Sequence, residues 1–370
     1  MTVAVIMNRN TQEQMLALLR GGLWGTPTDE RAFVGKKVSW KDIFYLAKEQ
    51  TVLGLVGDGL ALLPTACQPP QKAWMNFVMM AAQMEEQNKR MNDLVGLLAR
   101  KGCPFVLLKG QELALCYRNP LRRAPGDIDM FMGFDEERYE QGKAMVTAMA
   151  EKTGTPNDKR RHADFVVNGN VVEVHGNMRF CVSKACDSVF VDWMKKKVDG
   201  KRFRQVTIGG EQVNVLPADV DVLFVFVHLL NHLMQGGVGL RQVSDWMMAL
   251  HAHRVVMDKE LLKEDIRLLH LEKFWRPMAA MAVEQLGFPM EEMPLYDKKF
   301  SKKGERIMEH IFMTGNFGTR QKQNQIDDSH GRWIKKLVTF WGQIPLYWHT
   351  FWLYPKETLH CFVHYVKQSI

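Results

Sequence analysis

The sequence predicts an α+β protein in which a short run of strands separates two helical regions. Apolar residues recur at helical spacing over residues 11–100 and again after Pro217, while strand signals gather between 105 and 216. The strands come with a crossover helix and hairpin signals, and they do not form a repeating strand–helix array. Hydrophobic residues make up 46% of the chain and charged residues 24%, which is typical of globular proteins and excludes a disordered or collagen-like chain.

Prolines divide the first hundred residues into several expected helices. Met15 and Leu18 belong to one apolar face, and breaks are expected near Pro64 and Pro70. A longer helix is expected from about 71 to 100, where aromatic, aliphatic and methionine side chains follow helical spacing. The methionines in this stripe are expected to pack in the core, because their flexible side chains fill irregular space.

The middle segment holds the strand signals. Short apolar runs are separated by turn residues, including Gly169 and the Gly209-Gly210 pair, which favour hairpins. Asp135 precedes acidic residues, as is typical of a helix start. In order, we expect a strand over 105–108, a short helix over 112–117, a strand over 127–132, a helix over 135–150, and hairpins over 162–175 and 204–216.

Helical spacing returns after Pro217. Helices are expected over 219–232 and 240–253, with more to about 287 and a last set from about 302. We therefore divide the chain into a helical region over 1–98, an α+β core over 99–216, a helical domain over 217–295 and an aromatic-rich helical region over 296–370.

Charge and cysteine usage indicate an ordinary cytoplasmic protein with a basic surface. Lys and Arg number 49 and Asp and Glu 41, a net charge of +8 that permits, without requiring, an anionic partner. The six cysteines are scattered without a C-x-x-C pair, so we expect reduced thiols and neither a zinc knuckle nor a disulfide framework. The first residues do not resemble a signal peptide.

One uncharged stretch runs from Leu337 to Tyr354. It contains Gly342, Pro345 and His349, so we expect no membrane-spanning helix. The favoured interpretation is a packed terminal helical hairpin. The alternative is a surface that docks on a membrane or a partner, because Trp341, Trp348, Trp352 and Tyr354 suit such an interface.

The residues with the clearest chemical signal are two aspartates on an expected strand. Asp127 and Asp129 are two positions apart, so their side chains point to one face. Adjacent carboxylates repel unless a cation lies between them, and such hard oxygen ligands suit Mg²⁺, or Mn²⁺, when phosphates complete the shell. Upstream, Lys109-Gly110 ends a strand; a glycine lets the backbone approach a phosphate and a lysine adds a positive charge.

Glu173 is a candidate third carboxylate. It lies on an otherwise apolar strand and shares a face with His175. If this face is the one that bears the aspartates, three carboxylates converge, as metal-dependent phosphoryl chemistry requires. His175 either orients Glu173 or is a packed histidine.

These motifs resemble a known family. The pattern of a strand, a Lys-Gly turn, a helix and then R-x-x-G-D-I-D is similar to the polymerase-β-like nucleotidyltransferase superfamily, and more closely to a bacterial family of uncharacterised nucleotidyltransferases. The matching segments are Leu108-Lys109-Gly110 with Leu113-Ala114, Arg123-x-x-Gly126-Asp127-Ile128-Asp129, Val172-Glu173-Val174-His175, and Gly239-Leu240-Arg241-Gln242-x-x-Asp245-Trp246.

The resemblance implies a polymerase-β-like core over 99–216 and transfer of a nucleoside monophosphate from an NTP to a hydroxyl. It implies Asp127, Asp129 and Glu173 as catalytic metal ligands for Mg²⁺ or Mn²⁺. The acceptor is left open among RNA, a protein side chain and a small molecule. We expect the nucleotide to be bound by Lys109, Gly110, Gln111, Arg123 and Gly126, and further pocket positions at His175, Arg241 and Asp245.

Two alternatives stay open. The wider superfamily usually has Gly-Ser or Gly-Gly at its phosphate turn, whereas Gln111 follows Gly110 here. A non-catalytic nucleotide- or RNA-binding module on the same fold is therefore the first alternative. The second is an interaction protein that docks through the C-terminal aromatic segment. His228 and His232 have the spacing of a zinc pair on a helix, but we expect two hydrogen-bonded histidines because no third ligand follows.

Overall fold

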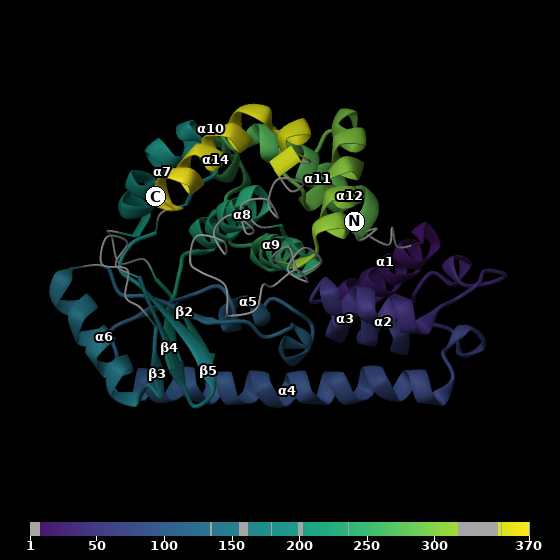
Figure 1. Cartoon of the computed structure of the whole chain (residues 1–370), viewed down its shortest axis with the longest axis horizontal. Helices are drawn as coiled ribbons and strands as arrows, with labels where there is room; N and C mark the ends of the chain where they lie inside the picture. Colours follow the sequence, from purple (N-terminus) through teal and green to yellow (C-terminus); the bar gives the residue numbers. More distant parts are fainter. Residues whose placement is uncertain are drawn as a thin grey trace.

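The computed structural model in Figure 1 combines helices with one mixed sheet. It describes residues 8–133, 135–154, 162–178, 180–198, 203–235, 237–316, 347–348 and 350–369. Trp341 and most of the uncharged C-terminal stretch lie outside the described residues. Within them, the expected α+β class is confirmed.

Three N-terminal helices form a compact group: α1 (Arg9–Trp24), α2 (Trp40–Glu49) and α3 (Leu53–Ala61). The backbones of α1 and α3 approach so closely that glycine is required at the crossing. A Cβ atom on Gly22 would lie 1.9 Å from the Leu55 carbonyl oxygen, and one on Gly59 would lie 1.8 Å from the Leu18 carbonyl oxygen.

The long helix α4 (Gln71–Arg100) has the bounds that the apolar spacing predicts. It runs along the bottom of Figure 1, under the N-terminal helices at one end and the sheet at the other. Phe77 and Met84 join the apolar core of the helical region, whereas Leu94 and Leu98 join the core beneath the sheet. The expected boundary at residue 98 therefore falls inside this helix.

The described strands form a seven-stranded sheet in the order β3-β4-β5-β2-β1-β7-β6. Central β2 is parallel to β5 and antiparallel to β1, while β4–β5 and β6–β7 are the two predicted hairpins. The edge strand β3 was not predicted. The strands are β1 (Val106–Leu108), β2 (Ile128–Phe131), β3 (Lys152–Thr153), β4 (His162–Val167), β5 (Asn170–His175), β6 (Arg204–Ile208) and β7 (Glu211–Val215).

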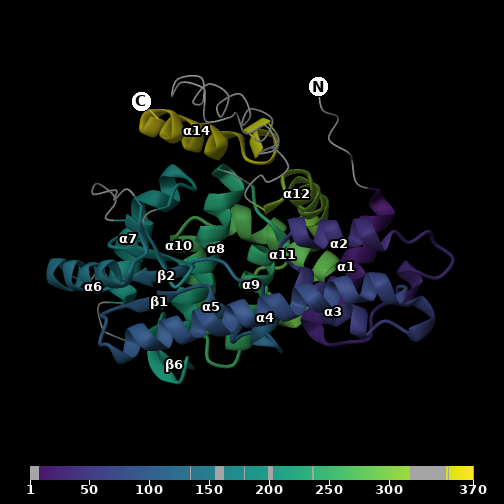
Figure 2. The same cartoon turned by 60° about the horizontal axis from the view of Figure 1, so that its bottom comes forward.

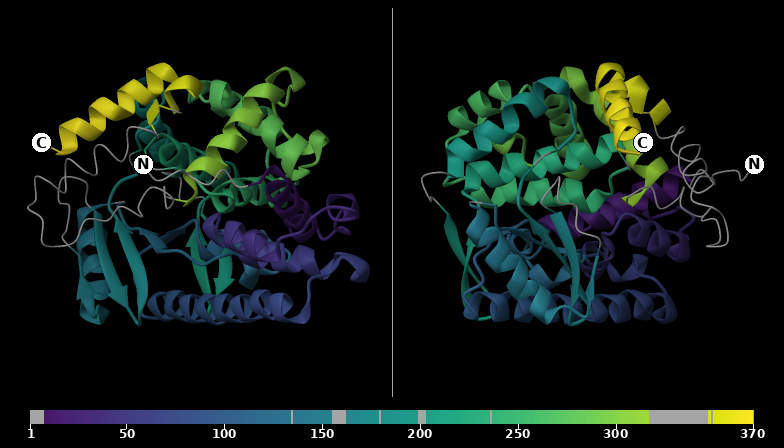
Figure 3. Two further views of the ribbon diagram at one scale, coloured as in Figure 1. Left: turned by 45° about the vertical axis from the view of Figure 1, so that its right-hand side comes forward. Right: turned by 60° about the vertical axis from the view of Figure 1, so that its left-hand side comes forward.

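The two faces of the sheet belong to different cores. Leu107, Ile128 and Met130 face α4 in one apolar cluster, whereas Val106 and Leu108 join the larger helical core on the opposite face. Because strand side chains alternate, Asp129 points away from the α4 core, toward the side of the helical region. Both views of Figure 3 show α4 at the bottom and the C-terminal helices at the top, with the strands between them.

The remaining helices connect to this sheet or build the second helical region. The short helix α5 follows β1 and the longer α6 follows β2, both as expected. Helix α7, between the two hairpins, was not predicted. In the helical region Phe226, Trp246 and Trp275 pack with ring centroids 4.7–5.1 Å apart. The helices are α5 (Gln111–Ala114), α6 (Glu136–Met149), α7 (Lys184–Val198), α8 (Ala218–Gln235), α9 (Leu240–His253), α10 (Lys259–Leu268), α11 (Glu272–Leu286), α12 (Ser301–Thr314) and α14 (Pro355–Ser369).

The last described helix lies on the outside of the molecule. Figure 2 shows α14, in yellow, lying across α7 and α8. Trp348 and Trp352 are 60% and 68% exposed, while Tyr354 is buried against Phe274. Over the described parts of the chain, no helix combines the length and apolar character needed to cross a membrane.

Candidate active site

Two of the three predicted carboxylates lie side by side on the two central parallel strands. The register of β2 and β5 pairs Asp129 with Glu173 and Phe131 with His175. Asp127 lies directly before β2, two residues from Asp129, and the charges of Asp129 and Glu173 both act on it. Asp129 and Glu173 therefore share the face that the sequence indicated.

The Lys109-Gly110 turn brings a lysine to the same place. Lys109 has a φ of +36°, unusual for a residue with a side chain, and Gly110 follows with a φ of +70°. A Cβ on Gly110 would lie 3.3 Å from the Asp127 carbonyl oxygen. The Lys109 ammonium lies 3.0 Å from Asp129 Oδ1 and 3.0 Å from His228 Nε2. The turn thus directs its lysine onto the carboxylates.

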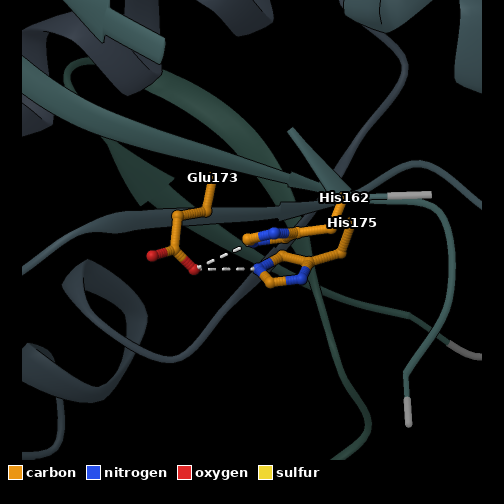
Figure 4. A group of neighbouring side chains, drawn as sticks. All are labelled: His162, Glu173 and His175. Atoms are coloured by element: carbon orange, nitrogen blue, oxygen red, sulfur yellow. Dashed lines mark ion pairs between the residues drawn. The ribbon is translucent and has the colours of Figure 1, made fainter. Parts of the chain in front are cut away.

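Two histidines from adjacent strands approach one carboxylate oxygen of Glu173 (Figure 4). His175 Nε2 lies 2.9 Å from Asp129 Oδ1 and 3.4 Å from Glu173 Oε2, and His162 Nε2 lies 3.5 Å from the same Glu173 oxygen. The ligand atoms of His162, Glu173 and His175 all lie within 4.8 Å of one another. His175 thus orients both carboxylates, and His162 is a neighbour that sequence reasoning did not select.

The carboxylates differ in how well they are neutralised. Burial, followed by the negative charges of Glu173 and Asp129, raises the pKa of Asp127 to about 6. Burial acts in the same direction on Glu173, but hydrogen bonds with His162 and His175 outweigh it and hold the pKa of Glu173 below its usual range. Burial opposes the charge on His175, yet hydrogen bonds to the Asp129 and Glu173 carboxylates raise its pKa to about 9.

His228 and His232 form the expected hydrogen-bonded pair on α8, with 2.8 Å between their Nε2 atoms. Burial, together with the charge of Lys109, lowers the pKa of both rings, to about 3 for His232. A neutral His228 can accept a hydrogen bond from the Lys109 ammonium. This contact, which sequence spacing could not reveal, links α8 to the turn after β1.

Arg123 and Asp245 form a buried ion pair across the site. Arg123 Nε donates to Asp245 Oδ1 at 2.7 Å and a terminal nitrogen donates to Oδ2 at 2.8 Å, with both side chains 5% exposed. The Tyr117 hydroxyl donates to Asp245 Oδ1 at 2.8 Å. Asp245 thus pairs with Arg123 and not with Arg241, whose guanidinium donates to the carbonyls of Ala124 and Pro125.

The other predicted nucleotide-binding positions differ in their surroundings. Gly126 lies against Arg241, whose nearest nitrogen would be 2.9 Å from an added Cβ. Gln111 is 3% exposed, and its amide contacts Met91 Sδ at 3.6 Å, so its side chain points into the core. A small pocket is lined by Lys109, Asp127, Asp129, Arg123 and Arg241 among others. Asp245 also lines it, so three basic side chains face three carboxylates, and an anionic ligand would fit best together with a cation.

A mixed sheet with carboxylates on its central strands, beside a lysine-glycine turn, agrees with the nucleotidyltransferase class that the sequence motifs resemble. The sequence profile of a family described as "Uncharacterised nucleotidyltransferase" matches residues 36–287, and the chain belongs to this family. Neither a curated protein nor a solved structure matches the chain. Family membership supports a transferase and implies a nucleoside triphosphate as substrate.

Proposed function

We propose that this protein is a metal-dependent nucleotidyltransferase that moves a nucleoside monophosphate from an NTP to an acceptor hydroxyl. The observation that carries the proposal is the parallel register of β2 and β5, which sets Asp129 beside Glu173 with Asp127 two residues away. We further propose that residues 99–216 form the catalytic core, that the helical regions shape the acceptor site and that the protein acts in the cytoplasm.

We propose that the three carboxylates bind a divalent cation, for which they would supply oxygen ligands. Among the described residues, the Asp127 carboxylate forms no hydrogen bond or ion pair, although it is partly buried and the charges of two other carboxylates act on it. Such an oxygen donor set suits Mg²⁺ or Mn²⁺ in company with phosphates. Asp127, Asp129 and Glu173 would hold the metal, which would neutralise the phosphates and activate the acceptor hydroxyl.

The chain's own residues would position the donor and the acceptor. Lys109 would contact a phosphate oxygen, and His228 would hold the lysine near Asp129, as their 3.0 Å contact indicates. His175 would keep Asp129 and Glu173 in place through its hydrogen bonds. Glu173, ionised because its histidine neighbours stabilise its charge, would favour deprotonation of the acceptor hydroxyl.

A thermal-shift titration with ATP, GTP, CTP and UTP, each with Mg²⁺ or Mn²⁺, tests the nucleotide site. A ligand at a hundredfold excess over its Kd stabilises the folded state by about 2.7 kcal/mol, which is readily measured. The informative variant is Asp127→Asn, because the raised pKa of Asp127 means that its charge destabilises the folded protein at pH 7. This variant should melt no earlier than wild type without ligand, yet lose the metal-dependent response.

Asp93→Asn is the matched control, because Asp93 is exposed on α4, away from the site. It should respond to NTP and metal as wild type does. Release of pyrophosphate during an acceptor screen of RNA, proteins and small molecules would establish transfer. Binding without pyrophosphate release would favour a nucleotide-binding module, and a response that survives in Asp127→Asn would overturn the proposed site.

A further inference from the structure

A second cluster of potential metal ligands lies outside the candidate active site. It joins the segment after β5, the first turn of α7 and the terminal helix α14. Cys181 Sγ lies 3.4 Å from Cys361 Sγ, and His360 Nε2 lies 2.9 Å from Asp187 Oδ2. The ligand atoms of Cys181, Asp187 and His360 all lie within 4.8 Å of one another. A sulfur, a carboxylate and an imidazole thus form one group, and the second sulfur, of Cys361, adjoins it through Cys181.

This donor set has the chemistry of a zinc site. Thiolates and imidazole favour zinc over Mg²⁺ or Ca²⁺, and structural zinc usually has four ligands. Two thiolates on one tetrahedral zinc, each at about 2.3 Å, are about 3.8 Å apart. The 3.4 Å between Cys181 and Cys361 is close to that value and far longer than a disulfide bond of about 2.05 Å.

The ligands are held by further contacts. Asp187 Oδ1 accepts hydrogen bonds from the backbone N–H groups of Val182 and Ser183 at 3.0 and 3.3 Å. The other carboxylate oxygen, Oδ2, faces His360. The Cys181 N–H donates to Asn231 Oδ1 at 3.0 Å. Such outer contacts orient the ligands of metal sites.

Burial divides the cluster into a closed and an open side. The side chains of Cys181 and Cys361 are buried, whereas those of His360 and Asp187 are 32% and 22% exposed. A metal ion can therefore enter past the histidine and the carboxylate and reach the two sulfurs. Water would be excluded from the sulfur side once the ion is bound.

We propose that Cys181, Cys361, His360 and Asp187 bind a structural zinc ion that ties α14 to the start of α7. Two other groups of converging ligands are weaker candidates for this role. Glu112, Asp221 and His253 already have the Arg204 guanidinium among them, 2.6 Å from Glu112. His162, Glu173 and His175 belong to the candidate active site.

Metal analysis of the full-length protein tests the proposal. Protein purified without chelator should carry one zinc ion per chain, and Cys361→Ser and His360→Ala should lose it. Cys103→Ser is the matched control, because Cys103 is a buried cysteine far along the chain from this cluster. It should retain zinc at the wild-type level. Chelation of zinc should lower the melting temperature of wild type and of Cys103→Ser, and leave that of Cys361→Ser unchanged.

Cobalt substitution keeps the test independent of how well the variants fold. Co²⁺ added to the metal-free wild-type protein should give thiolate-to-cobalt charge-transfer absorption with the visible bands of a tetrahedral site. A cobalt spectrum without thiolate absorption would place the metal elsewhere and overturn the proposal. The absence of bound zinc would also overturn it. If thiol titration finds two fewer free thiols than the six cysteines, and a peptide linked through Cys181 and Cys361 is found, the two cysteines are a redox pair instead.

Discussion

Replacing Asp245 with alanine would leave the Arg123 guanidinium charged and buried without its carboxylate. In the folded protein Asp245 accepts two hydrogen bonds from Arg123 and a third from the Tyr117 hydroxyl. Burial opposes the charge of Arg123, but Asp245 more than compensates and raises the arginine pKa. After the substitution, the remaining hydrogen bond of the guanidinium among the described residues is to the Ala124 carbonyl, at 3.3 Å.

The expected loss of stability follows from the burial of both partners. Removing one partner of a buried ion pair lowers the unfolding free energy by about 3–5 kcal/mol, because the remaining charge is buried without a counter-charge. The Tyr117 hydroxyl would also lose its acceptor, but the two losses share one site and do not simply add. A typical domain is stable by about 5–15 kcal/mol, so Asp245→Ala should remove a large fraction of the unfolding free energy.

Urea unfolding monitored by tryptophan fluorescence measures this loss, since Trp246 follows Asp245 in α9. The double variant Arg123→Met/Asp245→Leu should recover most of the stability, because apolar side chains in a buried site need no charged partner. Glu260→Ala provides the exposed comparison. Its pair with Lys263, at 2.7 Å, leaves the Glu260 side chain 75% exposed, and its removal should cost less than about 1 kcal/mol.

A loss below about 1 kcal/mol for Asp245→Ala would refute the reasoning, because the pair would then behave as an exposed one. A double variant less stable than Asp245→Ala would also contradict it. In that case packing and hydrogen bonding by the polar groups, and not the unpaired charge, would account for the loss.

Two further predictions concern other parts of the fold. Gly59→Ala should lower the unfolding free energy by about 1–3 kcal/mol or more, because its Cβ would lie 1.8 Å from the Leu18 carbonyl oxygen. Gly57→Ala in the same helix, with no atom within 4 Å of the added Cβ, should be neutral or stabilising in the same urea assay. Burial raises the pKa of Glu112 to about 8, despite its pairing with Arg204, so its contribution to stability should decrease as pH rises from about 4.5 to about 8. Glu112→Gln should therefore gain stability relative to wild type between pH 5 and pH 8, and urea midpoints that keep a constant difference would contradict this.

Local patterns predicted the elements with strong periodicity and clear turns. The 30-residue α4 and both hairpins are in their expected places, because apolar spacing and turn glycines are encoded within each element. The edge strand β3 (Lys152–Thr153) is two exposed residues, too short to produce a pattern. Helix α7 was missed because its apolar residues are interrupted by charged and polar ones.

The candidate site was predictable where it follows strand alternation and not where it depends on tertiary packing. The shared face of Asp129 and Glu173 follows from their strands once these pair in parallel. The contact between Lys109 and His228 joins residues 119 positions apart, and no spacing rule encodes it. The same holds for Arg123, whose pairing with Asp245 depends on how α9 packs against the loop before β2.

Helix α4 packs in the core of the helical region at one end and in the core beneath the sheet at the other. This affects how the protein folds during synthesis and which fragments of it can be expressed. The helix is synthesised before any strand of the sheet, and domains generally fold from the N-terminus during synthesis. The strands can therefore assemble onto a helix that the N-terminal region already holds in place. A fragment that began at residue 99 would leave Leu107, Ile128 and Val172 without the apolar cover of Leu94 and Leu98. Expression of residues 99–216 by themselves should therefore yield aggregated protein, and a useful fragment must retain the whole of α4.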